Sequence, residues 1–123
     1  MNWTLDKSRP ICPQICEQIC VAVANGEFSA GERLLSVREI ALLAGVNPNT
    51  VQKSFEELER RGVIHSVRCS GWYVNENTDA AKEEVEALRM KRTEEYLSAM
   101  SQLGCDYDSV IKYLNEIREV NNE

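Results

Sequence analysis

Four polar side chains at the start of one predicted helix have the chemistry needed to contact DNA. Asn49 and Thr50 are followed by Gln52 and Lys53, which together supply amides, a hydroxyl and a cation. Amides and hydroxyls form hydrogen bonds with base edges in the major groove, and cations pair with phosphates. The positive end of the helix dipole also favours an approaching anion. This pattern predicts a helix that reads DNA.

Two short helices joined by a tight turn position these side chains. A capping box opens the first helix at Ser36, and Gly45 supplies the left-handed residue that ends it. Asn47 is suited to cap the second helix, and Pro48 fits its first position, where an N–H is not needed. The residues expected on the buried faces are Ile40, Ala41 and Ala44 in the first helix and Val51, Phe55 and Leu58 in the second. Residues 36–55 therefore form a helix-turn-helix.

A β-hairpin is predicted directly after the reading helix. Gly62 ends that helix, and residues 63–67 are rich in β-branched side chains. Residues 68–71 have turn character, and residues 72–74 form the returning strand. A hairpin in this place is a wing.

The remaining chain is predicted to be helical. An extended arm over residues 1–9 leads to a first helix over residues 10–25. After the wing, residues 78–103 form a long helix, and Asp106 caps a last helix beyond Gly104. The fold class is therefore mainly α with a small β-hairpin wing. We expect a winged helix-turn-helix domain over residues 1–76 and a two-helix tail over residues 77–123.

The two tail helices carry an apolar stripe that they cannot bury alone. A second copy of the chain is the simplest partner for it, so the tail is predicted to form a homodimer. The residues assigned to dimerisation are Val85, Leu88, Tyr96, Leu97, Met100, Leu103, Val110, Ile111, Leu114 and Ile117.

The charge of the chain is concentrated in the tail. The net charge is −6, but residues 1–76 hold 8 basic and 9 acidic side chains, against 6 and 11 in residues 77–123. The head is nearly neutral, so only a locally basic face could bind phosphate. No apolar run approaches the roughly 18 residues needed to span a bilayer, and the start does not resemble a signal peptide. We therefore expect a cytoplasmic protein with no membrane partner.

Residues 10–75 resemble the GntR family of bacterial transcription regulators. The resemblance is carried by Gly26-Glu27, Gly31, Leu34, Ser36, Arg38, Ala41, the run from Val46 to Val51, Leu58, Gly62 and the wing end Gly71-Trp72-Tyr73-Val74. The short tail resembles the YtrA-like subfamily, whose tail dimerises and is too small for the metabolite pocket of larger GntR proteins. Two positions depart from the family pattern: Leu35 stands in place of a proline, and Cys69 in place of a wing glycine.

The resemblance implies roles for individual residues. Arg38 would clamp a phosphate or a base, and Asn49 and Thr50 would lie at the reading end of the recognition helix. The wing near Arg68 and Gly71 would reach the adjacent minor groove. The full set of candidate DNA-binding residues is Ser36, Arg38, Asn47, Asn49, Thr50, Gln52, Lys53, Arg68 and Gly71.

Three cysteines keep a second hypothesis open. Cys12, Cys16 and Cys20 recur every four residues along one helix face, which would suit a thiol- or metal-responsive sensor. The alternative is that they pack as small buried hydrophobes. A protein-interaction module on the same fold is a further alternative. With His65 the only histidine and no phosphate-binding loop, nothing indicates an enzyme, a cofactor or a metal.

Together these patterns predict a sequence-specific transcription regulator, most simply a homodimeric repressor on an inverted-repeat operator of double-stranded DNA. The identity of any small-molecule effector is unknown from the sequence.

Overall fold

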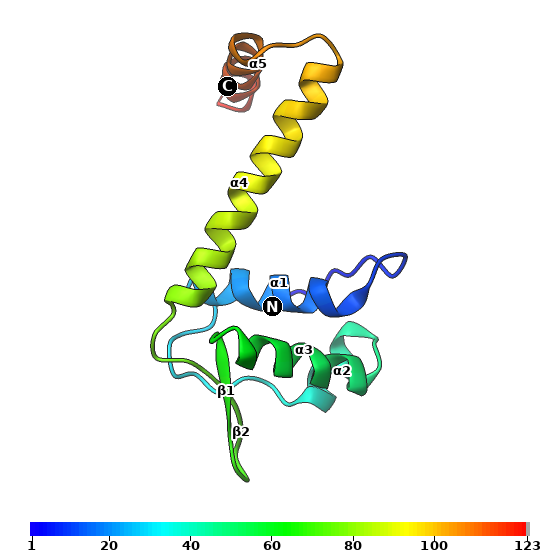
Figure 1. The fold of residues 1–123 in the computed structure, drawn as a ribbon, viewed down its shortest axis with the longest axis vertical. Helices are drawn as coiled ribbons and strands as arrows, with labels where there is room; N and C mark the ends of the chain where they lie inside the picture. The colour runs from blue at the N-terminus through cyan, green and yellow to red at the C-terminus, as the bar shows by residue number, and fades with distance from the viewer. Residues whose placement is uncertain (123) are drawn as a thin grey trace. The chain divides into compact units, whose positions relative to one another are not determined.

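The computed structural model describes residues 1–122, so the last residue of the expected 77–123 tail lies outside the described residues. Five helices and one hairpin occur in this part of the chain (Figure 1). In chain order they are α1 (Ile11–Ala24), α2 (Val37–Ala44), α3 (Pro48–Arg60), β1 (Ile64–Val67), β2 (Gly71–Val74), α4 (Asp79–Gln102) and α5 (Tyr107–Asn121). The predicted fold class, mainly α with a hairpin wing, is confirmed.

The chain divides into two compact units. The first comprises residues 1–86, and the second begins at residue 87. The first unit holds α1, α2, α3, the hairpin and the first two turns of α4, because Ala81 and Val85 belong to its hydrophobic core. Val85, which was assigned to dimerisation, is thus buried inside its own chain.

The helix-turn-helix is closed by the predicted caps. The Ser36 hydroxyl accepts a hydrogen bond from the Glu39 N–H at 3.1 Å. Gly45 has a φ of 69°, the left-handed conformation that lets α2 end in a sharp turn. The Asn47 side chain then accepts from the Asn49 N–H at 2.8 Å and opens α3. These local bonds satisfy backbone groups that each helix end would otherwise leave unpaired.

The core of the first unit lies between α1 and α3. Its fully buried side chains include Ile15, Ile19, Val51, Phe55 and Leu58. The Phe55 ring meets the Trp72 ring of β2 edge-on, with centroids 5.3 Å apart. This contact joins the recognition helix to the wing, so the two elements share one apolar core.

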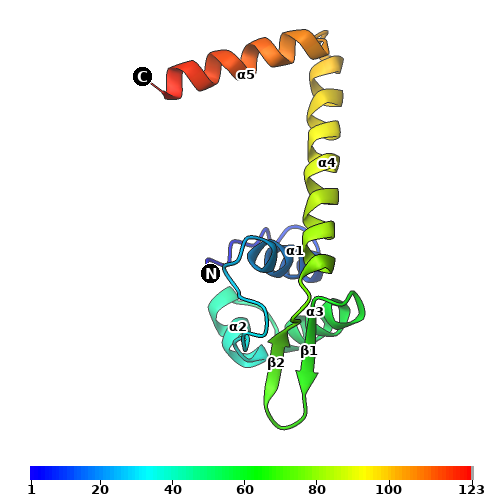
Figure 2. The same ribbon diagram turned by 90° about the vertical axis from the view of Figure 1, so that its left-hand side faces the viewer.

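The wing hairpin is extended by a third segment. β1 and β2 are antiparallel, with Ile64 opposite Val74 and Val67 opposite Gly71. Residues 31–34 run along the other edge of β2, where Leu34 N–H donates to the Trp72 carbonyl at 2.9 Å. The hairpin projects beyond the helices of its unit (Figure 2). β2 is therefore hydrogen-bonded along both of its edges.

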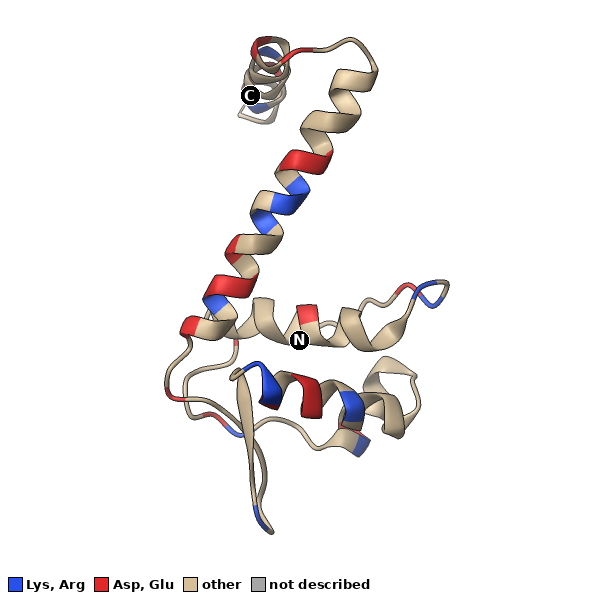
Figure 3. Ribbon diagram, in the orientation of Figure 1, with Lys and Arg blue, Asp and Glu red and all other residues tan. Residues whose placement is uncertain are grey.

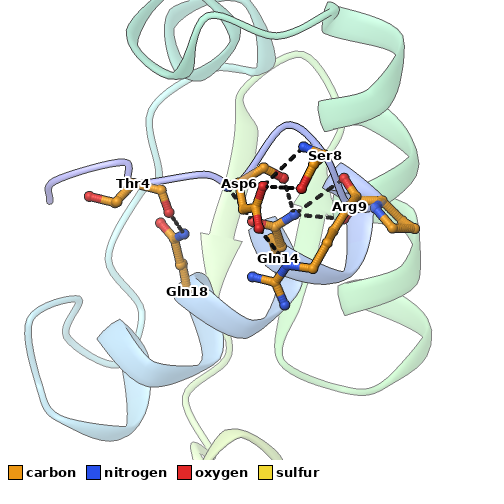
Figure 4. A network of polar contacts seen from close by, with 7 residues as sticks. Thr4, Asp6, Ser8, Arg9, Gln14 and Gln18 are labelled. Atoms are coloured by element: carbon orange, nitrogen blue, oxygen red, sulfur yellow. Dashed lines mark hydrogen bonds and ion pairs between the residues drawn. The ribbon is translucent and has the colours of Figure 1, made fainter.

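The N-terminal arm is extended only over its first residues. Residues 6–9 turn back, because the Asp6 carboxylate accepts from Ser8 and Arg9 (Figure 4). Hydrogen bonds from Ser8 lower the pKa of Asp6. The Gln14 side chain accepts from the Asp6 N–H at 2.8 Å, and Lys7 Nζ donates to the Gly45 carbonyl at 3.0 Å. The arm is thereby fixed to α1 and to the turn of the motif.

The tail ends in a helical corner. Gly104, with a φ of 77°, follows α4, and the Asp106 side chain accepts from the Ser109 N–H at 2.9 Å to open α5. From this corner α5 extends away from the end of α4 instead of folding back along it (Figure 2). Most of the apolar stripe of α5 is consequently uncovered within one chain.

Candidate nucleic-acid interface

The exposed face of α3 carries two polar side chains that have no partner among the described residues. Asn49 and Lys53 are both exposed, whereas Thr50 and Gln52 are half-buried. The Gln52 amide donates to the Glu56 carboxylate at 3.1 Å. The two unpartnered side chains lie on the first two turns, so the start of α3 presents an amide and a cation to solvent.

The glutamates on α3 form hydrogen bonds with nearby groups, and Glu57 is paired with two arginines. Glu57 accepts hydrogen bonds from both Arg60 and Arg61, and those bonds lower its pKa to about 2. Glu59 accepts from the Ser66 N–H at 3.0 Å and so joins α3 to β1. Glu57 therefore repels phosphate less than a free carboxylate would, whereas Glu56 and Glu59 bond neutral groups and keep their charge.

The start of α2 carries a second unpartnered cation. Arg38 is the second residue of α2, and its exposed side chain forms no ion pair or hydrogen bond with residues 1–122. It lies next to the Ser36 cap, whose hydroxyl is occupied by the Glu39 N–H. Asn47 is likewise occupied as the cap of α3. The structure thus uses Ser36 and Asn47 to hold the helix ends that carry the other candidates.

The wing tip combines a cation with a strained turn. Arg68 is exposed, and the turn is closed by the Ser70 N–H donating to the Val67 carbonyl at 3.0 Å. Cys69 has a φ of 63°, in the left-handed region that glycine adopts without strain. A glycine would adopt this conformation more easily than Cys69 does.

Sequence reasoning missed Arg33. Its place in a loop before α2 gave no sign of a role, but the pairing of residues 31–34 with β2 brings it to the wing. Its guanidinium lies over Gly71: its Nε and Nη2 are 3.3 and 3.5 Å from the point that a Cβ on Gly71 would occupy. The guanidinium of Arg33 therefore lies against Gly71, and a Cβ at that position would require it to shift by a few tenths of an ångström.

The cations of the first unit gather on the predicted DNA-binding elements. Figure 3 shows Lys and Arg on α2, on α3 and at the hairpin turn. Within residues 1–86, the cations that have no carboxylate partner include Arg38, Lys53 and Arg68 on these elements and Arg33 beside β2. A nearly neutral unit thus has a locally basic set of side chains, which phosphate binding requires.

The comparison with known proteins agrees with this geometry. Residues 13–74 match the family of bacterial regulatory proteins described as the gntR family. The chain belongs to the GntR family. It is 30% identical to the HTH-type transcriptional regulator YhcF of Bacillus subtilis over 97% of this chain and 98% of that protein. It is 32% identical to the HTH-type transcriptional repressor YtrA of the same organism, over 89% and 85% of the two chains.

A solved structure extends the similarity to the fold. A GntR family transcriptional regulator from Listeria monocytogenes superimposes with a TM-score of 0.82 at 35% identity, over 91% of this chain and 98% of that one. The expected GntR and YtrA-like relationship is confirmed. This GntR protein is therefore a helix-turn-helix regulator of transcription and not an enzyme. None of its helices within residues 1–122 is long and apolar enough to cross a membrane.

Two of the three cysteines of α1 lie in the core of this GntR protein, and the third, Cys12, is half-buried. Cys16 and Cys20 are fully buried, and their thiols donate to the Ser54 carbonyl and to the Glu84 carboxylate. Burial raises the pKa of Cys16 to about 12 and raises that of Cys20 as well. Across residues 1–122 no group of three His, Cys, Asp or Glu side chains could hold a metal ion. These observations favour a role of Cys16 and Cys20 as buried core residues over a role in sensing thiol oxidation or a metal.

The raised thiol pKa predicts weaker stability at alkaline pH. Below pH 9 both the folded and the unfolded chain keep the Cys16 proton, so this thiol adds no pH dependence. Between pH 9 and about 12 only the folded chain keeps it, and the free energy of unfolding should fall by up to about 1.4 kcal/mol per pH unit. Urea unfolding near pH 8 and near pH 10 measures this. In a Cys16→Ala variant the free energy of unfolding should fall less between these two pH values. An equal fall in the variant and the wild type would contradict the prediction.

The tail of this GntR protein presents an apolar groove. A cavity of about 430 Å³ lies in the second unit between the end of α4 and α5. It is lined by Arg92, Thr93, Tyr96, Leu97, Tyr107, Val110, Ile111 and Leu114. Val110 is buried within the chain, but Leu103 is 80% exposed and Ile117 is 56% exposed. Leu88, Leu97 and Met100 are half-buried.

Proposed function

We propose that this GntR protein is a homodimeric repressor that binds an inverted-repeat operator through α3 and the wing. The observation that carries the proposal is the exposed start of α3, where Asn49 and Lys53 have no partner within residues 1–122. Arg38 on α2 and Arg68 on the wing are free in the same sense and lie on either side of α3 in sequence. Asn49 would read a base edge, and the cations would hold phosphates.

The proposed dimer forms through the tail. Within one chain α5 leaves Ile111, Leu114, Ile117 and Val120 between 40% and 69% exposed. Such a continuous apolar stripe is unfavourable in water, and a second copy of α5 and the end of α4 would cover it symmetrically. The remaining dimerisation candidates Leu88, Tyr96, Leu97, Met100, Leu103 and Val110 would support this interface from within the tail.

The dimer accounts for the symmetry of the proposed operator. Two recognition helices related by a two-fold axis would enter successive major grooves about 34 Å apart. The protein named YtrA is a repressor, which supports the same role here by exclusion of polymerase from the promoter. We place this activity in the cytoplasm, where the DNA is, and leave the effector unassigned.

Direct binding tests the proposal. Fluorescence anisotropy over a salt series would compare the DNA upstream of the protein's own gene with a shuffled duplex. Tight binding to the first duplex alone, with a steep salt dependence, is expected. Equal and weak binding to both would contradict sequence-specific regulation and favour a protein-interaction module. Transcription in vitro from the bound promoter should then fall as protein is added.

Replacing Arg38 by alanine should weaken operator binding strongly. A bidentate contact with a phosphate or a base is worth about 1–3 kcal/mol, so the dissociation constant should rise roughly 5- to 150-fold. Lys82→Ala is the matched control, because it removes the same charge from an exposed position on α4. Anisotropy on the operator measures both. An unchanged affinity for Arg38→Ala would remove this residue from the site.

A further inference from the structure

We propose that Arg33 is a DNA-phosphate contact of the wing and that Gly71 acts by seating it. Gly71 would then matter not for a close approach of DNA to its own backbone but for the room it leaves to another side chain. This inference rests on the proposed DNA-binding function and adds one residue, with its supporting position, to the interface.

The backbone fixes where Arg33 begins. Residues 31–34 are bonded along β2 at three points: Gly31 N–H donates to the Val74 carbonyl, Val74 N–H to the Glu32 carbonyl, and Leu34 N–H to the Trp72 carbonyl, at 2.8 to 3.0 Å. Arg33 lies opposite Tyr73, two residues from Gly71. Its side chain therefore runs along β2 toward the hairpin turn, where Arg68 lies.

The absence of a side chain at Gly71 leaves room for the guanidinium of Arg33; we call this space the Arg33 seat. Arg33 Nε and Nη2 lie 3.3 and 3.5 Å from the position of a Cβ built on Gly71, and Cζ lies 3.9 Å away. A methyl group there would crowd the guanidinium. Because the Nε–Nη2 edge faces Gly71, the donors of Nη1 are left for an outside partner.

Arg33 is available for such a partner. Its side chain is exposed, and it forms no ion pair or hydrogen bond with residues 1–122. The neighbouring carboxylate of Glu32 is turned away, because it accepts from the Ser29 N–H at 2.8 Å. The N–H groups of Nη1 and the second N–H of Nη2 point outward, and these donors with their positive charge suit the oxygens of a phosphate.

Substitutions of Arg33 give the first test. Arg33→Ala should weaken binding about tenfold on operator and on shuffled duplex alike, and should reduce the slope of log affinity against log salt by about 0.9 per site. Arg33→Lys should restore the slope and most of the affinity, because a phosphate needs only the charge. A loss confined to the operator, with an unchanged salt slope, would overturn the phosphate assignment.

A double-mutant cycle gives the second test. Gly71→Ala alone should weaken binding, but by less than Arg33→Ala, since a Cβ there requires the guanidinium to shift by only a few tenths of an ångström. In the Arg33→Ala background the same change should cost less than about twofold more, because the side chain it displaces is already gone. Gly71 has a φ of 127°, so thermal unfolding must first show that each variant is folded.

The outcomes separate this inference from the proposed function. If Gly71→Ala weakens DNA binding equally in the wild type and in Arg33→Ala, Gly71 acts independently of Arg33. That result would overturn the proposed role of Gly71 in positioning Arg33. Tight wild-type binding together with unchanged affinity of Arg33→Ala would overturn the contact but leave the proposed function intact. A wild-type protein that binds neither duplex would instead remove the proposed function itself.

Discussion

Replacing Leu114 by aspartate should convert the protein from a dimer to a monomer and weaken operator binding at least about 100-fold. Leu114 is 48% exposed within one chain and lines the apolar groove of the tail. In the proposed dimer it would be covered, and a buried unpaired carboxylate is strongly unfavourable. Loss of the dimer removes the gain from binding two half-sites at once, which is typically 10²- to 10⁴-fold.

Sedimentation velocity and anisotropy on the full operator would measure these two effects. Lys112→Gln is the matched control, because it makes the same change of −1 in charge at an exposed position of α5 outside the apolar stripe. A duplex with a single half-site provides a second control, on which the variant and the wild type should bind equally. If Leu114→Asp sediments as a dimer, the tail does not form the interface proposed here.

Replacing Phe55 by alanine should destabilise the first unit by about 3–5 kcal/mol, since it removes a fully buried aromatic ring. The ring lies in the core of α3 and meets Trp72 edge-on, so its loss leaves a cavity between the recognition helix and the wing. Urea unfolding followed by tryptophan fluorescence would measure the shift. Trp72 sits beside the new cavity and should report it directly.

Lys53→Ala on the same helix separates stability from binding. Lys53 is exposed and unpaired within residues 1–122, so its removal should change the free energy of unfolding by less than about 0.5 kcal/mol while weakening DNA binding. Phe55→Ala should lower the free energy of unfolding but leave DNA binding nearly unchanged at temperatures where the variant remains folded. A loss of less than about 1 kcal/mol for Phe55→Ala would mean that the core closes around the gap.

The helix-turn-helix could be predicted from the sequence because its signals are local. Ser36, Gly45, Asn47 and Pro48 each act within four residues, through caps and a left-handed turn, and all four have the predicted roles. The long tail helix and the hairpin were predicted within two residues of their observed bounds for the same reason. Local hydrogen bonds and periodic burial do not depend on knowing the rest of the fold.

Which side chains are left free to contact DNA or a second chain could not be predicted in the same way. The sequence does not show which glutamates of α3 have partners, whereas the structure pairs Glu57 with Arg61 and bonds Glu59 to Ser66. Val85 was expected at a dimer interface, but it packs in the core of the first unit. Each of these outcomes depends on a partner in another element or beyond the end of the helix.

The sequence by itself determined the family, the order of the elements and the exposed start of the recognition helix. Only the tertiary structure decided that Arg33 belongs to the wing, that Cys20 faces Glu84 across 64 positions, and that the stripe of α5 stays uncovered within one chain. The physical reason is distance along the chain: caps and periodicity are fixed by neighbours, whereas side-chain partners are chosen by how distant segments pack.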